Sequence, residues 1–183
     1  MAKTPQQIAD ELLVLECQEG SRAAFERLVS RWQERLWRHA YRMTGNDAAA
    51  WDAVQETWMA VVRGLRGLQD AAAFPGWAYR ICTNRCVDWV RREQQRRSAA
   101  EHLGQEARPE APPGGASDDH DAVRQAVARL PEDHRAIVSL HYGEGLGLAE
   151  IAEVLAIPEG TVKSRLFHAR EQLRERLEGG GHE

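Results

Sequence analysis

The strongest constraint on the fold is a stretch in the middle of the chain that cannot build a hydrophobic core. Residues 98–119 hold five acidic residues against one basic residue, with three prolines and three glycines, and Leu103 is their one large apolar side chain. Such a segment buries too little apolar surface to offset the entropy lost on ordering. We therefore expect a flexible linker over residues 98–120, between a domain at residues 1–97 and a second domain at residues 121–183.

The overall composition is that of a globular protein. Of the 183 residues, 28% are charged and 43% are hydrophobic, and the formal net charge is −4, which is ordinary for soluble domains. No apolar run approaches the roughly 20 residues that a membrane-spanning helix needs, and residues 1–10 lack the pattern of a signal peptide. Three cysteines are too few for a disulfide framework. We expect a cytoplasmic protein without membrane insertion.

Basic residues gather in two stretches although the whole chain is mildly acidic. Residues 80–97 hold six arginines against two acidic residues, and residues 161–177 hold five basic residues against two acidic ones. Both stretches suit a polyanionic partner, but two solvated helix faces would account for them equally well. The net charge predicts weak DNA binding by the isolated chain.

Apolar residues recur at helical spacing on both sides of the linker, and no stretch has the alternation of a strand. One buried helix face is expected over residues 25–37 and another over residues 48–65, with a break at residues 44–47. The second of these faces comprises Trp51, Val54, Trp58 and Val62. Pro75 suits the entry to a long helix over residues 77–97. The predicted fold class is all-α.

The helix expected over residues 77–97 has two unlike faces. Its apolar face comprises Ala78, Tyr79, Cys82, Cys86, Trp89 and Val90. Its polar face comprises Trp77, Arg80, Asn84, Asp88, Arg91 and Gln95. Because guanidinium groups hold phosphates while rings and amides receive unstacked bases, the polar face suits capture of single-stranded DNA. Two plainer interpretations stay open: Trp77 packs against the preceding loop, and Arg91 with Arg92 forms a solvated helix end.

The cysteines point to packing rather than to a metal or redox site. Cys82 and Cys86 fall on the apolar face, where cysteine acts as a small core residue. No Cys-x-x-Cys occurs, and His39 and His102 add no zinc-ligand spacing. We expect no metal and no cofactor.

The second domain ends in a predicted helix-turn-helix. A helix over residues 148–155, a turn at 156–159 and a helix over 160–177 have the lengths of that motif. On the last helix, the apolar face comprises Val162, Leu166, Ala169, Leu173 and Leu177. Phe167 lies on the opposite face, where a phenyl ring can meet a thymine methyl in the major groove. Packing of Phe167 against a neighbouring helix is the alternative.

Several short motifs of the second domain resemble region 4 of bacterial RNA polymerase sigma factors. They are Leu-Pro-Glu at 130–132, Ala-Ile-Val at 136–138, Gly-Glu-Gly at 143–145, Glu-Ile-Ala at 150–152 and Gly-Thr-Val-Lys-Ser-Arg-Leu at 160–166. The small extracytoplasmic-function (ECF) group is the most similar. Residues 25–92 resemble region 2 of the same family, so the two resemblances follow each other in the order of the family.

The resemblance implies three functional surfaces and a set of partners. Binding to core RNA polymerase, through its β and β′ subunits, would use Asp52, Gln55 and Glu56. Recognition and melting of the minus-ten promoter element would use Trp77, Arg80, Asn84, Arg91 and Arg92. The minus-thirty-five element would be read by Thr161, Lys163, Ser164, Arg165, Phe167, His168 and Arg170. The further partners are promoter DNA and, by family habit, an anti-sigma factor, with the chain a monomer in the holoenzyme.

The chain departs from the family pattern at a few positions. His168 stands where arginine is common, and Glu159 where a small apolar residue is usual. Trp51 and Ala53 replace the usual acidic residue and leucine. The first pair bears on the DNA contact, and the second pair on docking to the polymerase.

Other classes of function remain to be weighed. A sigma-like decoy would bind an anti-sigma factor without touching DNA, although the Trp/Asn/Arg face would then be without use. A stand-alone helix-turn-helix repressor would dimerise and bind a palindrome. An enzyme is not expected, because no nucleotide-binding loop, metal cluster or nucleophile–base pairing occurs at a known spacing.

Overall fold

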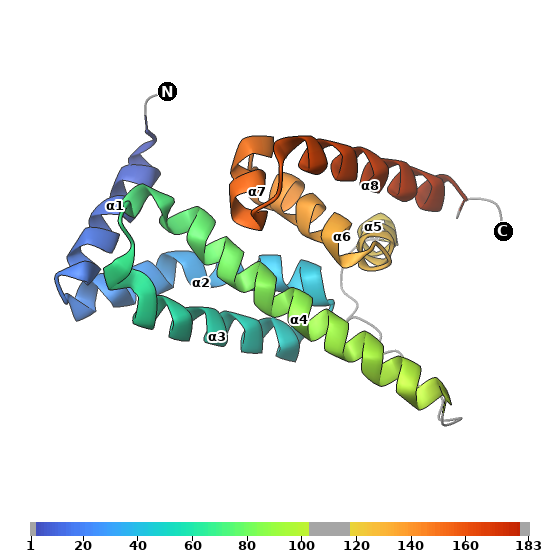
Figure 1. The fold of residues 1–183 in the computed structure, drawn as a ribbon, viewed down its shortest axis with the longest axis horizontal. Coiled ribbons are helices and arrows are strands. Elements are labelled where there is room, and N and C mark those ends of the chain that lie inside the picture. The colour runs from blue at the N-terminus through green and yellow to red at the C-terminus, as the bar shows by residue number, and fades with distance from the viewer. Residues whose placement is uncertain (1–2, 103–117, 180–183) are drawn as a thin grey trace.

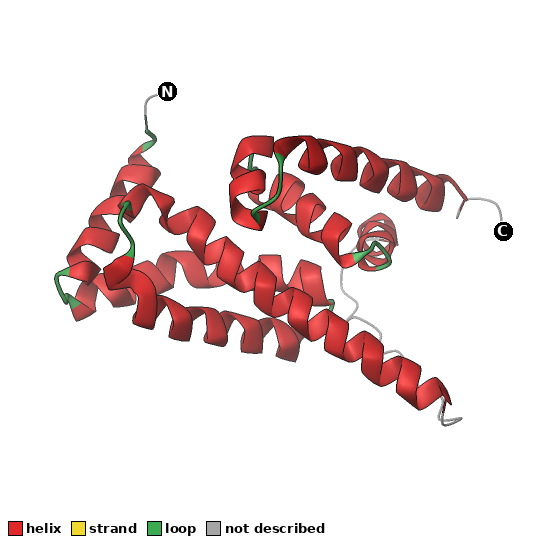
Figure 2. Cartoon of the chain, in the orientation of Figure 1, coloured by secondary structure: helices red, strands yellow, loops and turns green. Residues whose placement is uncertain are grey.

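The computed structural model describes residues 3–102 and 118–179, and all secondary structure within them is helical (Figures 1 and 2). The prediction of an all-α fold is therefore confirmed. The elements in chain order are α1 Pro5–Gln18, α2 Arg22–Thr44, α3 Asp47–Gly64, η1 Leu65–Gly67, η2 Ala71–Ala73, α4 Phe74–His102, α5 Asp118–Ala128, α6 Glu132–Val138, η3 Ser139–Gly143, α7 Leu148–Leu155 and α8 Glu159–Gly179. None of these described helices is long and apolar enough to cross a membrane.

Local capping signals explain where the first helices begin and end. The Thr4 hydroxyl accepts from the backbone N–H of Gln7, and the Gln7 side chain accepts from the Thr4 N–H, which completes a capping box. Ser21 and Asn46 cap α2 and α3 by a single bond each, in which the side chain accepts from the backbone N–H of Ala24 or Ala49. The break expected at residues 44–47 is a tight turn in which Gly45 has φ +66°, a conformation that glycine adopts without strain.

Helices α2, α3 and α4 form a bundle that α1 covers at one end. Its centre is aromatic: the Trp32 ring meets the rings of Phe74 and Tyr79 edge to face, with centroids 5.5 and 5.7 Å apart. Cys82 and Cys86 are fully buried in the same core, as the sequence predicts. This bundle contains the predicted polymerase-binding and minus-ten residues.

The buried face of α3 differs from the one expected. Trp51 is 44% exposed and Val62 is 61% exposed, so neither is a core residue. The buried positions are Ala49, Ala50, Ala53, Val54, Thr57 and Val61. The small alanines leave room for α2, which packs against α3. The Trp51 ring lies outside this face, near the Trp37 ring with centroids 6.0 Å apart.

Helices α5 to α8 form the second half, and α7 with α8 is the predicted helix-turn-helix. Ala156 closes α7 in the left-handed region at φ 53°. Val162, Leu166 and Ala169 are buried as expected, whereas Leu177 is 42% exposed near the end of α8. The helix that begins at Glu132 changes to a π-helical turn over Ser139–Gly143, which was not expected.

The two halves pack directly against each other. Helix α4 contacts α7 and α6, and α2 contacts η3, α5 and α6 (Figure 1). Buried side chains from both halves belong to one continuous hydrophobic cluster. Helix α4 runs five residues past the expected boundary at residue 97, to His102, and α5 begins at Asp118. Residues 103–117 of the expected linker lie outside the described part of the chain.

Candidate nucleic-acid interface

The polar side of α4 carries the predicted minus-ten residues. The side chains of Arg80, Asn84, Arg91 and Arg92 are exposed. Trp77 is half-buried: its ring meets Phe74 with centroids 6.4 Å apart, and a Cβ built on Gly64 would lie 2.9 Å from its Cζ2 atom. Trp77 thus packs against the end of α3 and its own neighbour Phe74, close to the plainer interpretation in which it packs against the preceding loop, and the residue stays partly exposed.

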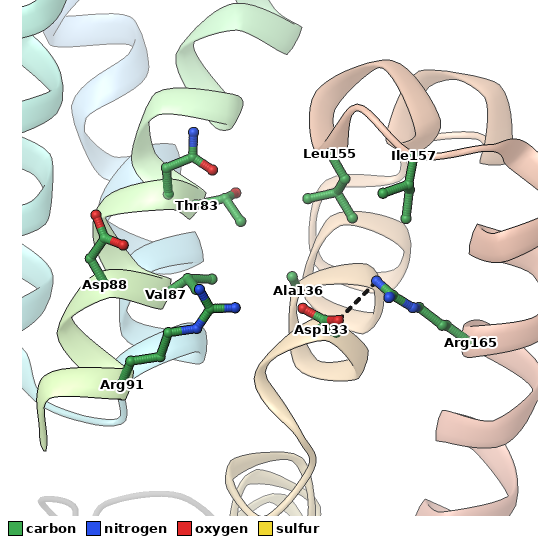
Figure 3. A pocket seen from close by; sticks show the side chains of 10 residues that line it. Thr83, Val87, Asp88, Arg91, Asp133, Ala136, Leu155, Ile157 and Arg165 are labelled. Atoms are coloured by element: carbon green, nitrogen blue, oxygen red, sulfur yellow. Dashed lines mark ion pairs between the residues drawn. The ribbon is translucent and has the colours of Figure 1, made fainter. Parts of the chain in front are cut away.

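A cleft of about 420 Å³ separates the polar side of α4 from the second half. Asp88 and Arg91 line one wall, and Asp133 and Arg165 line the other (Figure 3). Asn84 also lines the cleft. The Arg91 Nε is 3.1 Å from a carboxylate oxygen of Glu132. Arg165 forms an ion pair of 3.0 Å with Asp133 (Figure 3). One minus-ten candidate and one minus-thirty-five candidate are therefore paired with carboxylates in this arrangement.

The outer surface of α8 holds the remaining predicted minus-thirty-five residues. Phe167 is 59% exposed, and its ring contacts the ring of its own neighbour His168 at 5.6 Å. The alternative in which Phe167 packs against another helix is therefore wrong for this structure. Lys163, Ser164, His168 and Arg170 are also exposed, and Thr161 is partly exposed. Arg170 stacks over the Tyr142 ring, 5.6 Å from its centroid, which orients the guanidinium.

The predicted polymerase-binding residues form an exposed ridge on α3. Asp52, Gln55 and Glu56 all face solvent at helical spacings of three and four. Glu56 pairs with Arg85 of α4 at 3.3 Å. Met59, 51% exposed, continues the ridge. The ridge lies on a different helix from the surfaces of α4 and α8, so that a protein and DNA could be bound at separate places.

Sequence reasoning missed a buried polar network between the halves. Glu144, from the turn after η3, has a side chain only 5% exposed. It accepts hydrogen bonds from Arg42 of α2 and from the Tyr79 hydroxyl of α4. The glycines on both sides of Glu144 predict a turn, and a glutamate in a turn is normally solvated. No sequence pattern therefore indicated that Glu144 would be buried.

Histidine and tyrosine side chains in this network have strongly perturbed acid–base properties. The His39 ring bonds the Ser139 hydroxyl at 2.9 Å and the Thr83 hydroxyl at 2.8 Å. Complete burial, with a smaller contribution from nearby Arg42, lowers the pKa of His39 to about 3. Burial and then Glu144 raise the pKa of Tyr79. At neutral pH both side chains are uncharged and can act as hydrogen-bonding groups.

The described residues offer little to a metal ion. Nowhere in residues 3–102 and 118–179 do three or more histidine, cysteine or acidic side chains come together. A hydrogen bond with Cys82 and burial raise the pKa of Cys86. A thiol that keeps its proton is a poor metal ligand and a poor nucleophile.

Each half of the chain matches a known family of protein domains. The family described as "Sigma-70 region 2" matches residues 28–97, and "Sigma-70, region 4" matches residues 120–173. These two ranges contain most of α4 and α8, including all their candidate DNA-binding residues. The chain also shares 35% identity over 164 residues with "ECF RNA polymerase sigma factor SigE" of Mycolicibacterium smegmatis. That match covers 87% of this chain and 63% of the relative, so the chain spans less than two thirds of that protein's length.

Two further similarities extend over most of both chains. "ECF RNA polymerase sigma-E factor" of Haemophilus influenzae is 30% identical over 189 residues, which covers 94% of this chain and 97% of the relative. Among solved structures, CnrH in complex with the cytosolic domain of CnrY superposes with a TM-score of 0.72 at 24% identity. That superposition covers 93% of this chain and 98% of the other, and it shows a shared fold.

The helix-turn-helix half and the α4 half are thus regions 4 and 2 of a sigma-70 protein. Within that family, the chain belongs to the ECF RNA polymerase sigma factors.

Proposed function

We propose that this ECF sigma factor binds core RNA polymerase through the α3 ridge, captures the melted minus-ten element on α4, and reads the minus-thirty-five element with α8. The observation that carries the proposal is the match of both sigma-70 regions, in family order, to the helices whose exposed faces bear the required chemistry. Asp52, Gln55 and Glu56 would pair with basic groups of the β and β′ subunits.

The exposed face of α8 supports a role in reading duplex DNA. Lys163 and Arg170 flank the face and can neutralise phosphates, which fixes the register of the helix in the major groove. The Phe167 ring is exposed and can contact a thymine methyl, while His168 and Ser164 can bond base edges. Arg165 would join them once it is released from Asp133.

The exposed face of α4 supports capture of single-stranded bases. Stacking on an aromatic side chain contributes about 1–3 kcal/mol per base, which is comparable to the few kcal/mol that it costs to extrude one base. The accessible part of Trp77 and the Asn84 amide would receive bases, and Arg80, Arg91 and Arg92 would hold phosphates. Strand opening by binding energy alone needs no nucleotide hydrolysis, so we infer no catalytic activity and no cofactor.

The proposed partners indicate the cellular location of the protein and its copy number in the complex. We infer a cytoplasmic location, where the polymerase and the chromosome are found, and a single copy of the chain in each holoenzyme. An anti-sigma factor is a further proposed partner. Among structures with the same fold, one is described as the sigma factor RpoE with the anti-sigma factor NepR from Bartonella quintana.

Run-off transcription tests the main proposal. The full chain is mixed with bacterial core polymerase and a promoter-rich genomic library, and discrete new transcripts are expected. Binding to core polymerase without any transcript would point to missing promoters or to a defective DNA surface. No binding to core polymerase would overturn the proposal: anti-sigma binding alone would then favour the decoy, and dimerisation on a palindrome would favour the repressor.

The reading face of α8 has its own test. The double variant Phe167→Ala/His168→Ala is compared with the matched surface variant Glu171→Gln/Arg174→Gln on the same helix. The first should lose promoter choice, by about 1–3 kcal/mol per lost base contact, while the second retains it. If both variants choose the same promoters, α8 does not recognise bases through Phe167 and His168.

A further inference from the structure

The contact between the two halves is centred on one buried carboxylate. Glu144 belongs to the region 4 half, yet its recorded charged and hydrogen-bonding partners belong to the region 2 half. These are Arg42, the Tyr79 hydroxyl, and Arg35 with its Nε at 3.9 Å. The backbone of Gly143 lies directly against the Arg42 guanidinium, where even a Cβ would collide. Glycine at 143 therefore allows Arg42 to reach Glu144.

Polar side chains from both halves surround this carboxylate. The Arg42 Nε also donates to the Ser139 hydroxyl at 3.0 Å. Ser139 bonds in turn to His39, which bonds to Thr83. The hydroxyls and the imidazole are buried, but water could replace each of their bonds if the halves separated.

The physics of such a contact differs from that of an apolar core. A buried ion pair gains Coulomb energy but loses the hydration of both charges, so that its net contribution is small. Separation returns Glu144, and the already partly exposed Arg42, fully to water and recovers that hydration. The intact pair therefore adds little net free energy to closure, but loss of one partner alone leaves the other charge uncompensated in the interface and favours opening. Apolar side chains of both halves surround the pair in one continuous cluster.

The closed arrangement is incompatible with simultaneous use of both proposed DNA surfaces. Elements named for positions minus ten and minus thirty-five lie about 25 base pairs apart, or about 85 Å at 3.4 Å per base pair. In the closed chain, Arg91 of α4 and Arg165 of α8 line the same cleft (Figure 3). Asp88 and Asp133 in that cleft repel phosphate, and Arg91 is neutralised by Glu132 across it.

We propose that Glu144, held between Arg42 and Tyr79, is an autoinhibitory latch that keeps α4 and α8 closed on each other in the free chain. The proposal rests on the proposed function for its consequence, since release of the latch is what frees both DNA surfaces. The equilibrium between closed and open chains can be measured without polymerase or DNA, so the two ideas can fail separately.

Small-angle X-ray scattering of the isolated full chain tests the latch itself. Glu144→Gln removes the charge with little change of shape, and Gly143→Ala displaces Arg42 while leaving Glu144 in place. Each should raise the ratio of open to closed chains about tenfold, the effect of one hydrogen bond to a charged group, with helical circular dichroism unchanged. The matched control Glu34→Gln removes an exposed carboxylate that pairs with Arg38 within α2, and it should leave the scattering unchanged.

The latch is overturned if Glu144→Gln and Gly143→Ala both scatter like the wild type. It is also overturned if Glu34→Gln opens the chain as much as they do, because the response would then reflect net charge alone.

A reversible lock tests the inhibitory role. A Cβ at Gly76 of α4 would lie 3.6 Å from Val154 Cγ2 of α7, so Gly76→Cys/Val154→Cys can form a disulfide that holds the halves closed. The oxidised chain should give at least tenfold less run-off transcript than the same chain after reduction. Equal transcription in both states overturns autoinhibition. If neither state gives a transcript and the wild type is also silent, the proposed function is contradicted. The scattering experiment then tests the latch by itself.

Discussion

The core of the region 2 bundle is apolar, whereas the interface between the two halves combines apolar contacts with a polar network. At the bundle centre, Trp32, Phe74 and Tyr79 interlock through ring edges and exclude water. At the interface, the side chains of Glu144 and His39 are buried, and the partly exposed Arg42 is bonded to Glu144. Burial of apolar surface lowers the free energy of the folded chain, whereas buried charges nearly balance their own desolvation. The polar network therefore stabilises the closed chain less than an apolar contact of the same size would.

The largest effect should come from the apolar core. Trp32→Ala removes a ring that is 2% exposed, and it should lower the free energy of unfolding by about 3–5 kcal/mol. Trp51→Ala removes the same side chain from the surface of α3, where 44% of it is exposed, and should cost about 1 kcal/mol or less. Urea denaturation of both variants measures the difference. Equal losses in the free energy of unfolding would contradict the assignment of Trp32 to the core and of Trp51 to the surface.

The next effect should come from a buried cation at the interface. Arg135 of α6 donates to the backbone oxygen of Met43 in α2 at 2.6 Å and to that of Leu130 at 2.9 Å. Arg135→Ala leaves these buried carbonyls without that donor, and we expect a loss of about 2–3 kcal/mol. Arg135→Lys should recover only part of it, because an ammonium group cannot reach several carbonyls in the geometry of a guanidinium. Full stability of the alanine variant would contradict this role.

A moderate effect should follow from pH through His39. Its pKa is lowered to about 3 in the folded chain and lies near 6.5 when it is solvated. The unfolded or opened chain therefore binds the extra proton, so stability is full above pH 6.5 and falls as the pH drops. Between pH 7.5 and 5.5 the loss should be about 1.4 kcal/mol. The groups around His39 are Arg42 of the same helix, Tyr79 and Thr83 of α4, and Ser139 of η3, with Glu144 bonded to Tyr79 and Arg42.

Denaturation of wild type and His39→Gln at both pH values measures this contribution. The glutamine variant does not titrate in this range, so its loss between pH 7.5 and 5.5 should be smaller by about 1.4 kcal/mol. The same pH dependence in both chains would assign the effect to other groups.

The smallest effect should come from a surface ion pair. Arg174 and Glu171 of α8 pair at 3.0 Å, and their side chains are 59% and 43% exposed. Such pairs contribute little because water solvates both partners well. Arg174→Ala should change the free energy of unfolding by less than about 0.5 kcal/mol, as measured by thermal denaturation. A loss of stability as large as that of Arg135→Ala would show that the contribution of these two arginines does not depend on their exposure.

Much of the fold was predictable because helical periodicity is a local property. The all-α class, the break at Gly45 and the helix-turn-helix each depend on residues close together in sequence. The prediction for α3 was wrong because large side chains were expected inside, whereas the buried face carries the small residues Ala49, Ala50 and Ala53 and leaves Trp51 near the Trp37 ring. The exposure of Phe167 was predicted from the polar residues around it on the α8 face.

The candidate site was predictable in part for a similar reason. Motifs within single helices identified the exposed residues of α3, α4 and α8 as candidates, and their roles in binding stay predictions. The partial burial of Trp77 depends on Phe74 and on the end of α3 at Gly64, and the pattern of the α4 helix alone does not contain that contact with α3.

The sequence by itself determined the helices, their caps, the two family regions and the candidate residues on each face, because these depend on spacing along one segment. Only the tertiary structure decided that the two halves close on each other and that Glu144 becomes a buried partner of Arg42 and Tyr79. Those contacts join residues about 65 and 102 positions apart. A glutamate in a glycine-flanked turn reads as solvated until another helix covers it, since burial is a property of the neighbours and not of the segment.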